Sequence, residues 1–491
     1  MRRKSHNHAL RTFELSKGAF SRMGEHFRFR EVFSRPSTIS AGEVRRTMKK
    51  IFAFILSVIL ICSCVSAFAA ETDAEWRAMQ TPAQGVYAEE LSDEEFDALT
   101  ETTIIRDTDS ITGYTVTFRY QDPEATRVRI RGEWSFSDRY GITADGIAYY
   151  EPEEWKVGNF AMIPDFQGDW PAYDMIKNEK TGVWSYTIPL PSGTWSYRFI
   201  IGGVEGAEMK DYTDAVQTTD PNNRPFEDFV GAQNNSQVRV PFDSATQTED
   251  CSLQLPNPDG LSGTGEIVYY TMPNDDTNYE LFVYLPYGYD AGREEPYKVL
   301  YVSHGNGVES ATSWYNKGSV GYMLDNLIAQ ERIEPFVLVS INNYAVAETL
   351  GEYDVDNLVN NIMPYIEENY NVSAQAEGRA IAGLSRGSRF TMNTLLAYPD
   401  VANYYGLFST GLPDADLSKE LDFEALADAR LFIGYGAQEL CDPERAAGRL
   451  RLLSDLMYLE FPYDYQTFPG GHQWTVWRQN FVDFCEMTLW K

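Results

Sequence analysis

The sequence RAIAGLSRGSRFTMNTLLAYPD at residues 379–400 decides the fold of the larger part of this 491-residue chain. It reads as an apolar strand, the turn Gly383-Leu384-Ser385-Arg386-Gly387 and a helix. A G-x-S-x-G sequence between a buried strand and a helix is typical of the tight turn that raises a nucleophilic serine above a sheet. The glycines allow that turn because side chains there would collide with the neighbouring strand and helix. The stretch therefore predicts Ser385 as a nucleophile at a helix N-terminus, where backbone N–H groups can stabilise an oxyanion.

The sequence around this turn predicts a parallel sheet covered by helices. Residues 297–305 and 334–342 are continuous apolar runs of strand length, as expected for strands that are buried on both sides. Residues 318–332 and 354–370 have helical spacing. Strands that alternate with helices in this way build a doubly covered parallel sheet. We expect an α/β-hydrolase domain over residues 266–491.

A serine nucleophile needs a general base, and the imidazole of a histidine suits that task. Only two histidines, His304 and His472, lie beyond residue 70. His304 precedes the serine in the chain, whereas His472 follows a predicted strand and the glycine pair at 470–471. The order serine then histidine is the one found in α/β-hydrolases. We predict His472 as the base and a structural role for His304.

The third member of the triad should be a carboxylate between Ser385 and His472. Glu439 and Asp442 both follow the apolar strand at 429–440. Glu439 is favoured because it falls four residues beyond Tyr435, where the strand should end. Asp442 remains the alternative acid. Asp414 and Asp416, after the preceding strand, are less favoured.

The oxyanion hole is predicted from the backbone. One donor should be the N–H of Arg386, the residue after the nucleophile. The second should come from Gly305 or Asn306, in the loop after the strand at 297–305. Trp314 and Trp474 flank these loops in sequence, so each is either a wall of an acyl pocket or part of the core.

The first seventy residues differ from the rest of the chain. Residues 1–47 carry 11 Lys and Arg against 4 Asp and Glu, and they fit no targeting pattern. Residues 48–70 begin Met48-Lys49-Lys50, continue as an apolar run of about eleven residues and end in small residues, which is typical of a secretory signal peptide. We expect cleavage after Ala69 and a true start at Met48, which makes 1–47 a misread extension.

Two other interpretations of this segment are less favoured. A membrane anchor needs about twenty apolar residues, more than the run at 51–61 provides. A lipoprotein site at Cys62 or Cys64 is disfavoured because bulky Ile61 precedes Cys62 and a cysteine precedes the second candidate closely. We expect a secreted protein with no membrane contact after cleavage.

The region between the signal peptide and the hydrolase domain has a different sequence pattern. Residues 71–102 are an acidic leader or linker. Residues 103–240 contain short alternating runs separated by turn residues, which indicates antiparallel strands in a small sandwich. Residues 241–265 are rich in Pro, Gly, Ser and Asp and are predicted to be a linker.

The composition excludes several classes of protein. The chain has 41 Lys and Arg against 72 Asp and Glu, a formal charge of −31, whereas a nucleic-acid partner requires a basic surface. It has no Cys-x-x-Cys pair, no phosphate-binding loop and no dinucleotide-binding turn. We expect no metal, no cofactor and no nucleic-acid partner, and the sequence does not predict the oligomeric state. Export permits one disulfide among Cys251, Cys441 and Cys485, and Cys441 with Cys485 is a candidate pair that the sequence does not assign.

Two family resemblances extend this interpretation. Residues 103–240 contain VTFRY-x-DPEATRVRIRGEW (116–134) and DPNNRP (220–225), and this part resembles the immunoglobulin-like early-set module that precedes many polysaccharide-active domains. The C-terminal 225 residues or so contain YLPYGYD (284–290), YKVLYVSHGNG (297–307), GRAIAGLSRGSRF (378–390) and GGHQW-x-VW (470–477). On these motifs the C-terminal part resembles carbohydrate esterase family 1, the esterase D-like feruloyl and acetylxylan esterases. This resemblance implies hydrolysis of feruloyl or acetyl esters on a plant polysaccharide such as xylan. Glu439 stands where the family more often has Asp, and Arg386 puts a charge beside the acyl site.

The sequence thus predicts a secreted serine esterase, with three rivals. The protein could act on a different acyl group, or it could transfer the acyl group to an alcohol. The third rival is a non-catalytic glycan-binding protein whose hydrolase domain has decayed, which the Arg386 and Glu439 departures favour. A serine, a carboxylate and a histidine nevertheless occur in the order expected for a triad, which argues against a decayed domain.

Overall fold

The computed structural model describes residues 99–491 and strand β1 (Gln84–Gly85), except for several short internal segments. These exceptions are 139–141, 144–145, 148, 163–169, 204–213, 226–234, 274–275, 307–308, 343–354, 411–416 and 442. The predicted extension at 1–47, the signal peptide at 48–70 and most of the leader lie outside the described residues. Residues 75–491 cluster as one compact unit.

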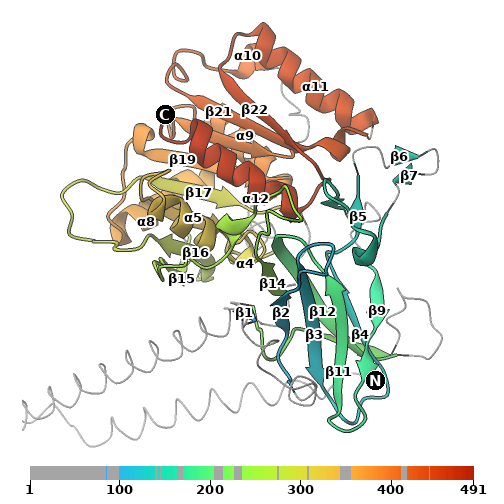
Figure 1. Ribbon diagram of the computed structural model, residues 1–491. Helices are drawn as coiled ribbons and strands as arrows, with labels where there is room; N and C mark the ends of the chain where they lie inside the picture. The colour runs from blue at the N-terminus through green and yellow to red at the C-terminus, as the bar shows by residue number, and fades with distance from the viewer. Residues whose placement is uncertain are drawn as a thin grey trace, which may run out of the picture. The chain divides into compact units, whose positions relative to one another are not determined.

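The N-terminal part of the described chain consists of β-strands in two larger sheets (Figure 1). The first sheet has the order β1-β2-β3-β11-β10, and the second has the order β13-β12-β4-β9 with β14 also paired to β12. Two small pairs, β5 with β8 and β6 with β7, lie outside these sheets. The bounds are β2 Thr103–Arg106, β3 Tyr114–Gln121, β4 Val128–Gly132, β5 Phe136–Ser137, β6 Ile142–Thr143, β7 Gly146–Ile147, η1 Pro152–Glu154, β8 Phe160–Ala161, β9 Ala172–Asp174, β10 Ile176–Lys177, β11 Val183–Pro189, β12 Gly193–Gly202, β13 Ala215–Thr218 and β14 Ser236–Val240.

The two larger sheets share one apolar core. Alternate residues of β3, Val116 and Phe118, are fully buried, because successive side chains of a strand point to opposite faces of its sheet. Phe118 of the first sheet meets Tyr197 of the second with ring centroids 4.7 Å apart. Trp134 is fully buried beside them. The predicted all-β region in front of an α/β domain is therefore confirmed, and its immunoglobulin-like relationship stays a prediction.

The C-terminal part is built on an eight-stranded sheet with the order β15-β16-β18-β17-β19-β20-β21-β22 (Figure 1). The strands from β18 to β22 in this order are parallel, and β15 and β16 pair antiparallel at one edge. The bounds are β15 Thr264–Tyr270, β16 Tyr279–Leu285, β17 Val299–Ser303, β18 Val337–Ile341, β19 Arg379–Leu384, β20 Tyr404–Phe408, β21 Arg430–Gly436 and β22 Tyr463–Phe468.

Helices cover both faces of this sheet. Their bounds are η2 Ser252–Gln254, α4 Ser313–Asn316, α5 Val320–Ala329, α7 Val355–Asn357, η3 Leu358–Ile362, α8 Met363–Asn369, η4 Ala376–Gly378, α9 Arg386–Ala397, α10 Leu417–Glu420, η5 Ala437–Cys441, α11 Pro443–Tyr458, α12 Trp474–Asp483 and η6 Phe484–Thr488. Residues of α7 to α11 pack in one apolar cluster, and residues of α4, α5 and α12 pack in another.

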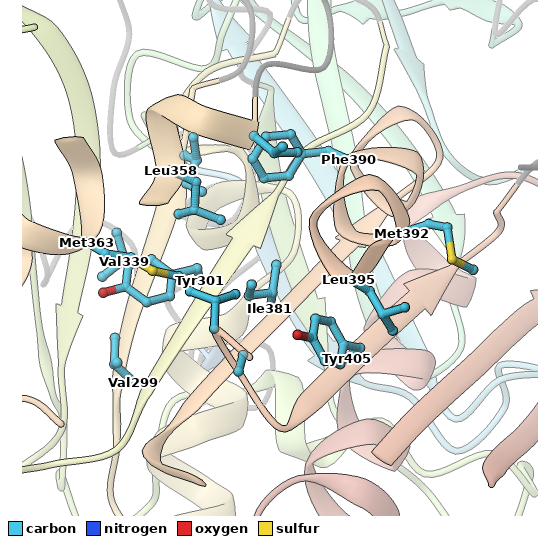
Figure 2. Packing of buried hydrophobic residues seen from close by; sticks show 14 of the residues in the cluster. Val299, Tyr301, Val339, Leu358, Met363, Ile381, Phe390, Met392, Leu395 and Tyr405 are labelled. Carbon is cyan, nitrogen blue, oxygen red and sulfur yellow. The ribbon is translucent and has the colours of Figure 1, made fainter. Parts of the chain in front are cut away.

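The continuous apolar runs of the central strands follow from burial on both faces. In β17, Val299 and Tyr301 belong to the first cluster, whereas Leu300 and Val302 belong to the second. Figure 2 shows the first cluster, where Tyr301 and its neighbours on β19 and β20 lie beneath the side chains of α9. This double covering holds the carboxyl ends of the parallel strands in fixed positions, and the candidate site lies at those ends.

Hydrogen bonds join the β-rich region to the α/β domain. The side-chain amide of Gln473 donates to the carbonyl oxygen of Ala161 at 2.7 Å, just before α12 begins. Arg478 of α12 is 1% exposed and donates to the carbonyl oxygen of Thr194 at 3.0 Å. The predicted linker also packs, since Asn326 of α5 donates to the carbonyl oxygen of Leu255 at 2.8 Å.

Two further findings concern the cysteines and membranes. Cys485 is a free thiol that is buried in the core, so the candidate disulfide with Cys441 is not formed. The reason is that η6 turns Cys485 into the apolar cluster of α5 and α12. Within the part of the chain that the structure describes, no helix is both long and apolar enough to cross a bilayer.

Candidate active site

Ser385 lies in the turn between β19 and α9, in a backbone conformation that non-glycine residues seldom adopt. Its φ and ψ are 52° and −113°. Such a conformation is strained and persists only where the surrounding structure enforces it. Here the Ser385 N–H donates to the carbonyl oxygen of Phe408 at 2.8 Å, on the neighbouring strand. A Cβ on Gly387 would lie 2.3 Å from the carbonyl oxygen of Ser303, so this position requires glycine.

The structure brings Ser385, His472 and Glu439 into one chain of hydrogen bonds. His472 Nε2 lies 2.8 Å from Ser385 Oγ, and His472 Nδ1 lies 2.8 Å from Glu439 Oε2. The imidazole is 26% exposed, while the Glu439 side chain is fully buried. The serine end of these linked hydrogen bonds is therefore open to a ligand, and the carboxylate end is closed to water.

The loops that carry the histidine and the acid are tied to each other. The N–H of Gly470 donates to Gln438 Oε1 at 2.6 Å, and the N–H of Gln438 donates to the carbonyl oxygen of Gly470 at 3.0 Å. Gln438 immediately precedes Glu439, and Gly470 lies two residues before His472. This reciprocal pair fixes the distance between the two loops.

Glu439 has four hydrogen-bond partners. Its Oε1 accepts from Ser409 Oγ at 2.6 Å and from the N–H of Gly436 at 2.9 Å. Its Oε2 accepts from Arg449 of α11 as well as from His472. Burial alone would raise the pKa of Glu439, but the hydrogen bonds and the positive charges of His472 and Arg449 together hold that pKa below its ordinary value. The carboxylate is therefore ionised at neutral pH.

Ser409 links the acid to a tryptophan beside the histidine. Its φ is 53°, directly after β20, and its N–H donates to the carbonyl oxygen of Gly434 at 2.7 Å. Trp477 Nε1 donates to Ser409 Oγ at 2.9 Å. The Trp477 ring stands edge-on to the His472 ring with centroids 5.1 Å apart.

Four residues around the site were missed from the sequence: Ser409, Gln438, Arg449 and Trp477. Trp477 ends the GGHQW-x-VW motif at 470–477, so that motif carried a signal for it. Gln438 was adjacent to the predicted acid. Nothing in the sequence points to Ser409 or Arg449, because their roles depend on where β20 and α11 lie in space.

The alternative acids stay untested predictions. Asp442 lies outside the described residues, and so do Asp414 and Asp416. Glu439 is the carboxylate that the structure brings to His472.

The predicted oxyanion donors lie around the serine. Arg386 begins α9, so its backbone N–H is one of the first of that helix. A Cβ on Gly305 would lie 3.4 Å from Ser385 Cβ, which places the Gly305 backbone beside the nucleophile. Asn306 is exposed next to it. Their role as oxyanion donors stays a prediction.

His304 is fully buried in this loop and does not reach the serine. Its Nδ1 lies 3.0 Å from the carbonyl oxygen of Gly305. Burial lowers the pKa of His304, which keeps its imidazole neutral in the loop. A structural role agrees with these contacts.

The two tryptophans near these loops pack in the core. Trp314 is fully buried, and its ring meets that of Trp474 at right angles with centroids 5.3 Å apart. Trp474 is 7% exposed and also contacts Trp477. Trp314 offers no surface to a substrate, so its predicted place in an acyl-pocket wall is corrected to core packing, and Trp474 packs with it.

Over the described ranges, no group of three or more His, Cys, Asp and Glu residues is arranged to hold a metal ion.

Comparisons with known proteins find esterases among the matches. Residues 274–486 match the family model described as "Putative esterase". The chain is 28% identical over 319 residues to the endo-1,4-beta-xylanase/feruloyl esterase of Xylanibacter ruminicola, covering 62% of this chain and 40% of that protein. It is 27% identical over 166 residues to endo-1,4-beta-xylanase Y of Acetivibrio thermocellus, covering 33% of this chain and 15% of that protein. The chain thus spans less than half the length of either relative.

Solved structures support the fold. The enterobactin esterase FES of Shigella flexneri superposes with a TM-score of 0.50 at 16% identity, covering 80% of this chain and 98% of that protein. At this identity the similarity shows the α/β-hydrolase type of fold and nothing finer. Together with the curated relatives, the family match shows that this chain is similar to esterases, with the matched residues at 274–486.

Proposed function

We propose that the protein hydrolyses carboxylic esters by a Ser-His-Glu acyl-enzyme mechanism. The observation that carries this proposal is the unbroken chain from Ser385 Oγ through His472 to Glu439, with both distances at 2.8 Å. Nucleophile and base within hydrogen-bond reach, with the base oriented by a third group, are what such a mechanism requires.

In the first half-reaction, Ser385 Oγ attacks the ester carbonyl and His472 Nε2 accepts its proton. The negative charge that develops on the carbonyl oxygen is stabilised by the backbone N–H of Arg386 and by that of Gly305 or Asn306. Glu439 accepts the hydrogen bond from His472 Nδ1 and balances the imidazolium charge. When the tetrahedral intermediate collapses, His472 returns the proton to the leaving alkoxide, and the acyl group stays on Ser385.

In the second half-reaction, His472 removes a proton from water, and the resulting nucleophile attacks the acyl-enzyme carbonyl. The same backbone donors stabilise the second oxyanion. Collapse of this intermediate breaks the bond to Ser385 Oγ, which takes the proton from His472. The products are a carboxylic acid and an alcohol, and no cofactor takes part in the cycle.

We further propose that the ester is a feruloyl or acetyl substituent on a plant cell-wall polysaccharide such as xylan. The support is the alignment with a relative that is named both a xylanase and a feruloyl esterase, which extends beyond the esterase domain into the β-rich region. Export fits a polymeric substrate outside the cell and rests on the signal-peptide pattern at 48–70. Amino-terminal sequencing of the exported protein should find Ala70 first, and a retained Met48 would contradict export by cleavage.

The decisive experiment compares the wild-type chain with Ser385→Ala on p-nitrophenyl acetate, methyl ferulate and feruloylated arabinoxylan. Loss of the nucleophile should lower kcat by about 10⁴-fold or more, with an unchanged circular dichroism spectrum. Turnover that survives in the folded variant would refute the assignment of Ser385. The relative rates on the three substrates identify the acyl group.

A fluorophosphonate probe separates the enzyme from a decayed, glycan-binding relative. Labelling of the wild-type chain and its absence in Ser385→Ala are expected for an activated serine. An unlabelled wild-type chain would favour the decayed domain. Adding an alcohol acceptor to the methyl ferulate assay tests acyl transfer, since a transferase would form the new ester in place of free ferulate.

A further inference from the structure

The triad acid has a second cationic partner that the serine esterase mechanism does not require. Arg449 extends from the middle of α11 to the Glu439 carboxylate, and its side chain is 4% exposed. The guanidinium donates to Glu439 Oε2, the same oxygen that accepts from His472 Nδ1. Its other terminal nitrogen donates to the backbone carbonyl oxygen of Glu439 at 2.7 Å.

These contacts are specific to the acid. Among the described residues, the hydrogen bonds of Arg449 go to Glu439 alone, once to its side chain and once to its backbone. The guanidinium also lies over the Tyr435 ring, 4.7 Å from its centroid. The arginine is thus held on both sides, and it fixes the position of a glutamate whose side chain has one more rotatable bond than aspartate.

We propose that Arg449 is a positioning residue that sets the pH range of the esterase by sharing the charge of Glu439 with His472. This inference rests on the hydrolytic function proposed above. In a triad without such an arginine, the carboxylate charge is available in full to the imidazolium. Here the guanidinium compensates part of that charge, because it donates to the same Glu439 oxygen that accepts from His472.

Other ionisable groups near this cluster do not supply the same effect. Tyr435 of β21 and Tyr465 of β22 lie near Arg449, and burial raises the pKa of both phenols, so they stay neutral through the acidic and neutral range. Arg386 follows the nucleophile and carries the same charge in every variant below. Ser409 and Trp477 are uncharged. A pH profile that changes in an Arg449 variant therefore reports the loss of the Arg449 charge and not a change at another ionisable group.

The test compares two variants of the same residue on the most active substrate of the panel, with free acid quantified chromatographically between pH 4 and 9. Arg449→Gln removes the charge and keeps a hydrogen-bond donor. It should move the acidic limb of the kcat/KM profile to higher pH, because the full negative charge of Glu439 then acts on the catalytic base. Arg449→Lys keeps the charge and loses the fork geometry. It should leave that limb in place and lower kcat by about 10-fold.

Arg451→Gln is the matched control. Arg451 lies on the same helix, is 66% exposed and pairs with Asp455 at 3.6 Å, so its loss removes one charge without touching Glu439. Its pH profile should equal that of the wild type. A general electrostatic effect of α11 would instead move both profiles.

Several results would overturn the inference. A folded Arg449→Gln variant with an unmoved acidic limb would refute it, as would an Arg449→Lys variant whose limb moves as far as that of Arg449→Gln. If Arg449→Gln does not fold, as judged by circular dichroism, the lysine variant alone decides. An inactive wild-type chain would refute the proposed function instead, so the two failures are distinguishable.

Discussion

At the scale of single residues, the site depends on two serines that are held in a strained backbone conformation. Ser385 and Ser409 both have positive φ values, 52° and 53°, at the ends of adjacent strands. One carries the nucleophilic hydroxyl and the other supports the acid. Strained positions that cluster in this way indicate that the surrounding fold enforces the site.

Gly387 provides the sharpest residue-scale prediction. In Gly387→Ala, the new Cβ would lie 2.3 Å from the carbonyl oxygen of Ser303, so β17 and α9 must move apart. We expect the free energy of unfolding to fall by about 1–3 kcal/mol, as for overpacked cores, and kcat to fall with it because Ser385 shifts. Urea unfolding and steady-state kinetics measure both.

The control for this substitution is Gly292→Ala. There the nearest atom to a new Cβ is a side-chain oxygen of Asp290 at 3.4 Å, so stability and activity should stay close to wild type. Equal effects of the two substitutions would show that the loss at Gly387 is not a packing effect.

At the scale of elements, the sequence predicted what periodicity and chain order encode. The apolar runs at 297–305 and 334–342 became β17 and β18, and the G-x-S-x-G turn joined β19 to α9. The triad candidates Ser385, His472 and Glu439 followed from the same logic, and the structure brings them together. Ser409 and Arg449 could not be found this way, because a hydrogen bond between distant elements leaves no local pattern.

Gln438 tests how the elements around β21 and β22 hold the histidine. In Gln438→Ala, the buried N–H of Gly470 loses its side-chain acceptor, which costs about 1–3 kcal/mol locally. The loop that carries His472 should then sample positions away from Ser385. We expect kcat to fall about 10- to 100-fold while KM changes little, since the substrate contacts remain.

Steady-state kinetics on methyl ferulate check this expectation. Gln466→Ala is a suitable control, because Gln466 lies on β22 and, among the described residues, its side-chain hydrogen bond goes to a methionine sulfur, Met487 Sδ at 3.4 Å. A Gln438→Ala variant with wild-type kcat would mean that the remaining backbone bond from Gln438 to Gly470 is sufficient.

At the scale of the whole molecule, the described chain contains a β-rich region and an esterase domain joined by buried polar contacts. Arg478 is central to them, because its guanidinium donates to the carbonyl oxygens of Thr194 and Lys317 at 3.0 and 2.8 Å. Glu133 lies 4.0 Å away. Buried polar groups that satisfy each other across such a boundary favour unfolding as one unit.

The last prediction concerns this coupling. In Arg478→Met, the carbonyl oxygens of Thr194 and Lys317 lose their donor and Glu133 loses its ion-pair partner, so the free energy of unfolding should fall by about 3 kcal/mol or more. Differential scanning calorimetry should show one transition in the wild type and two in the variant. Arg332→Met is the control, since the Arg332–Glu486 pair is partly exposed and its loss should cost no more than about 1 kcal/mol. Two separate transitions in the wild type would contradict the coupling, because the β-rich region would then unfold independently of the esterase domain.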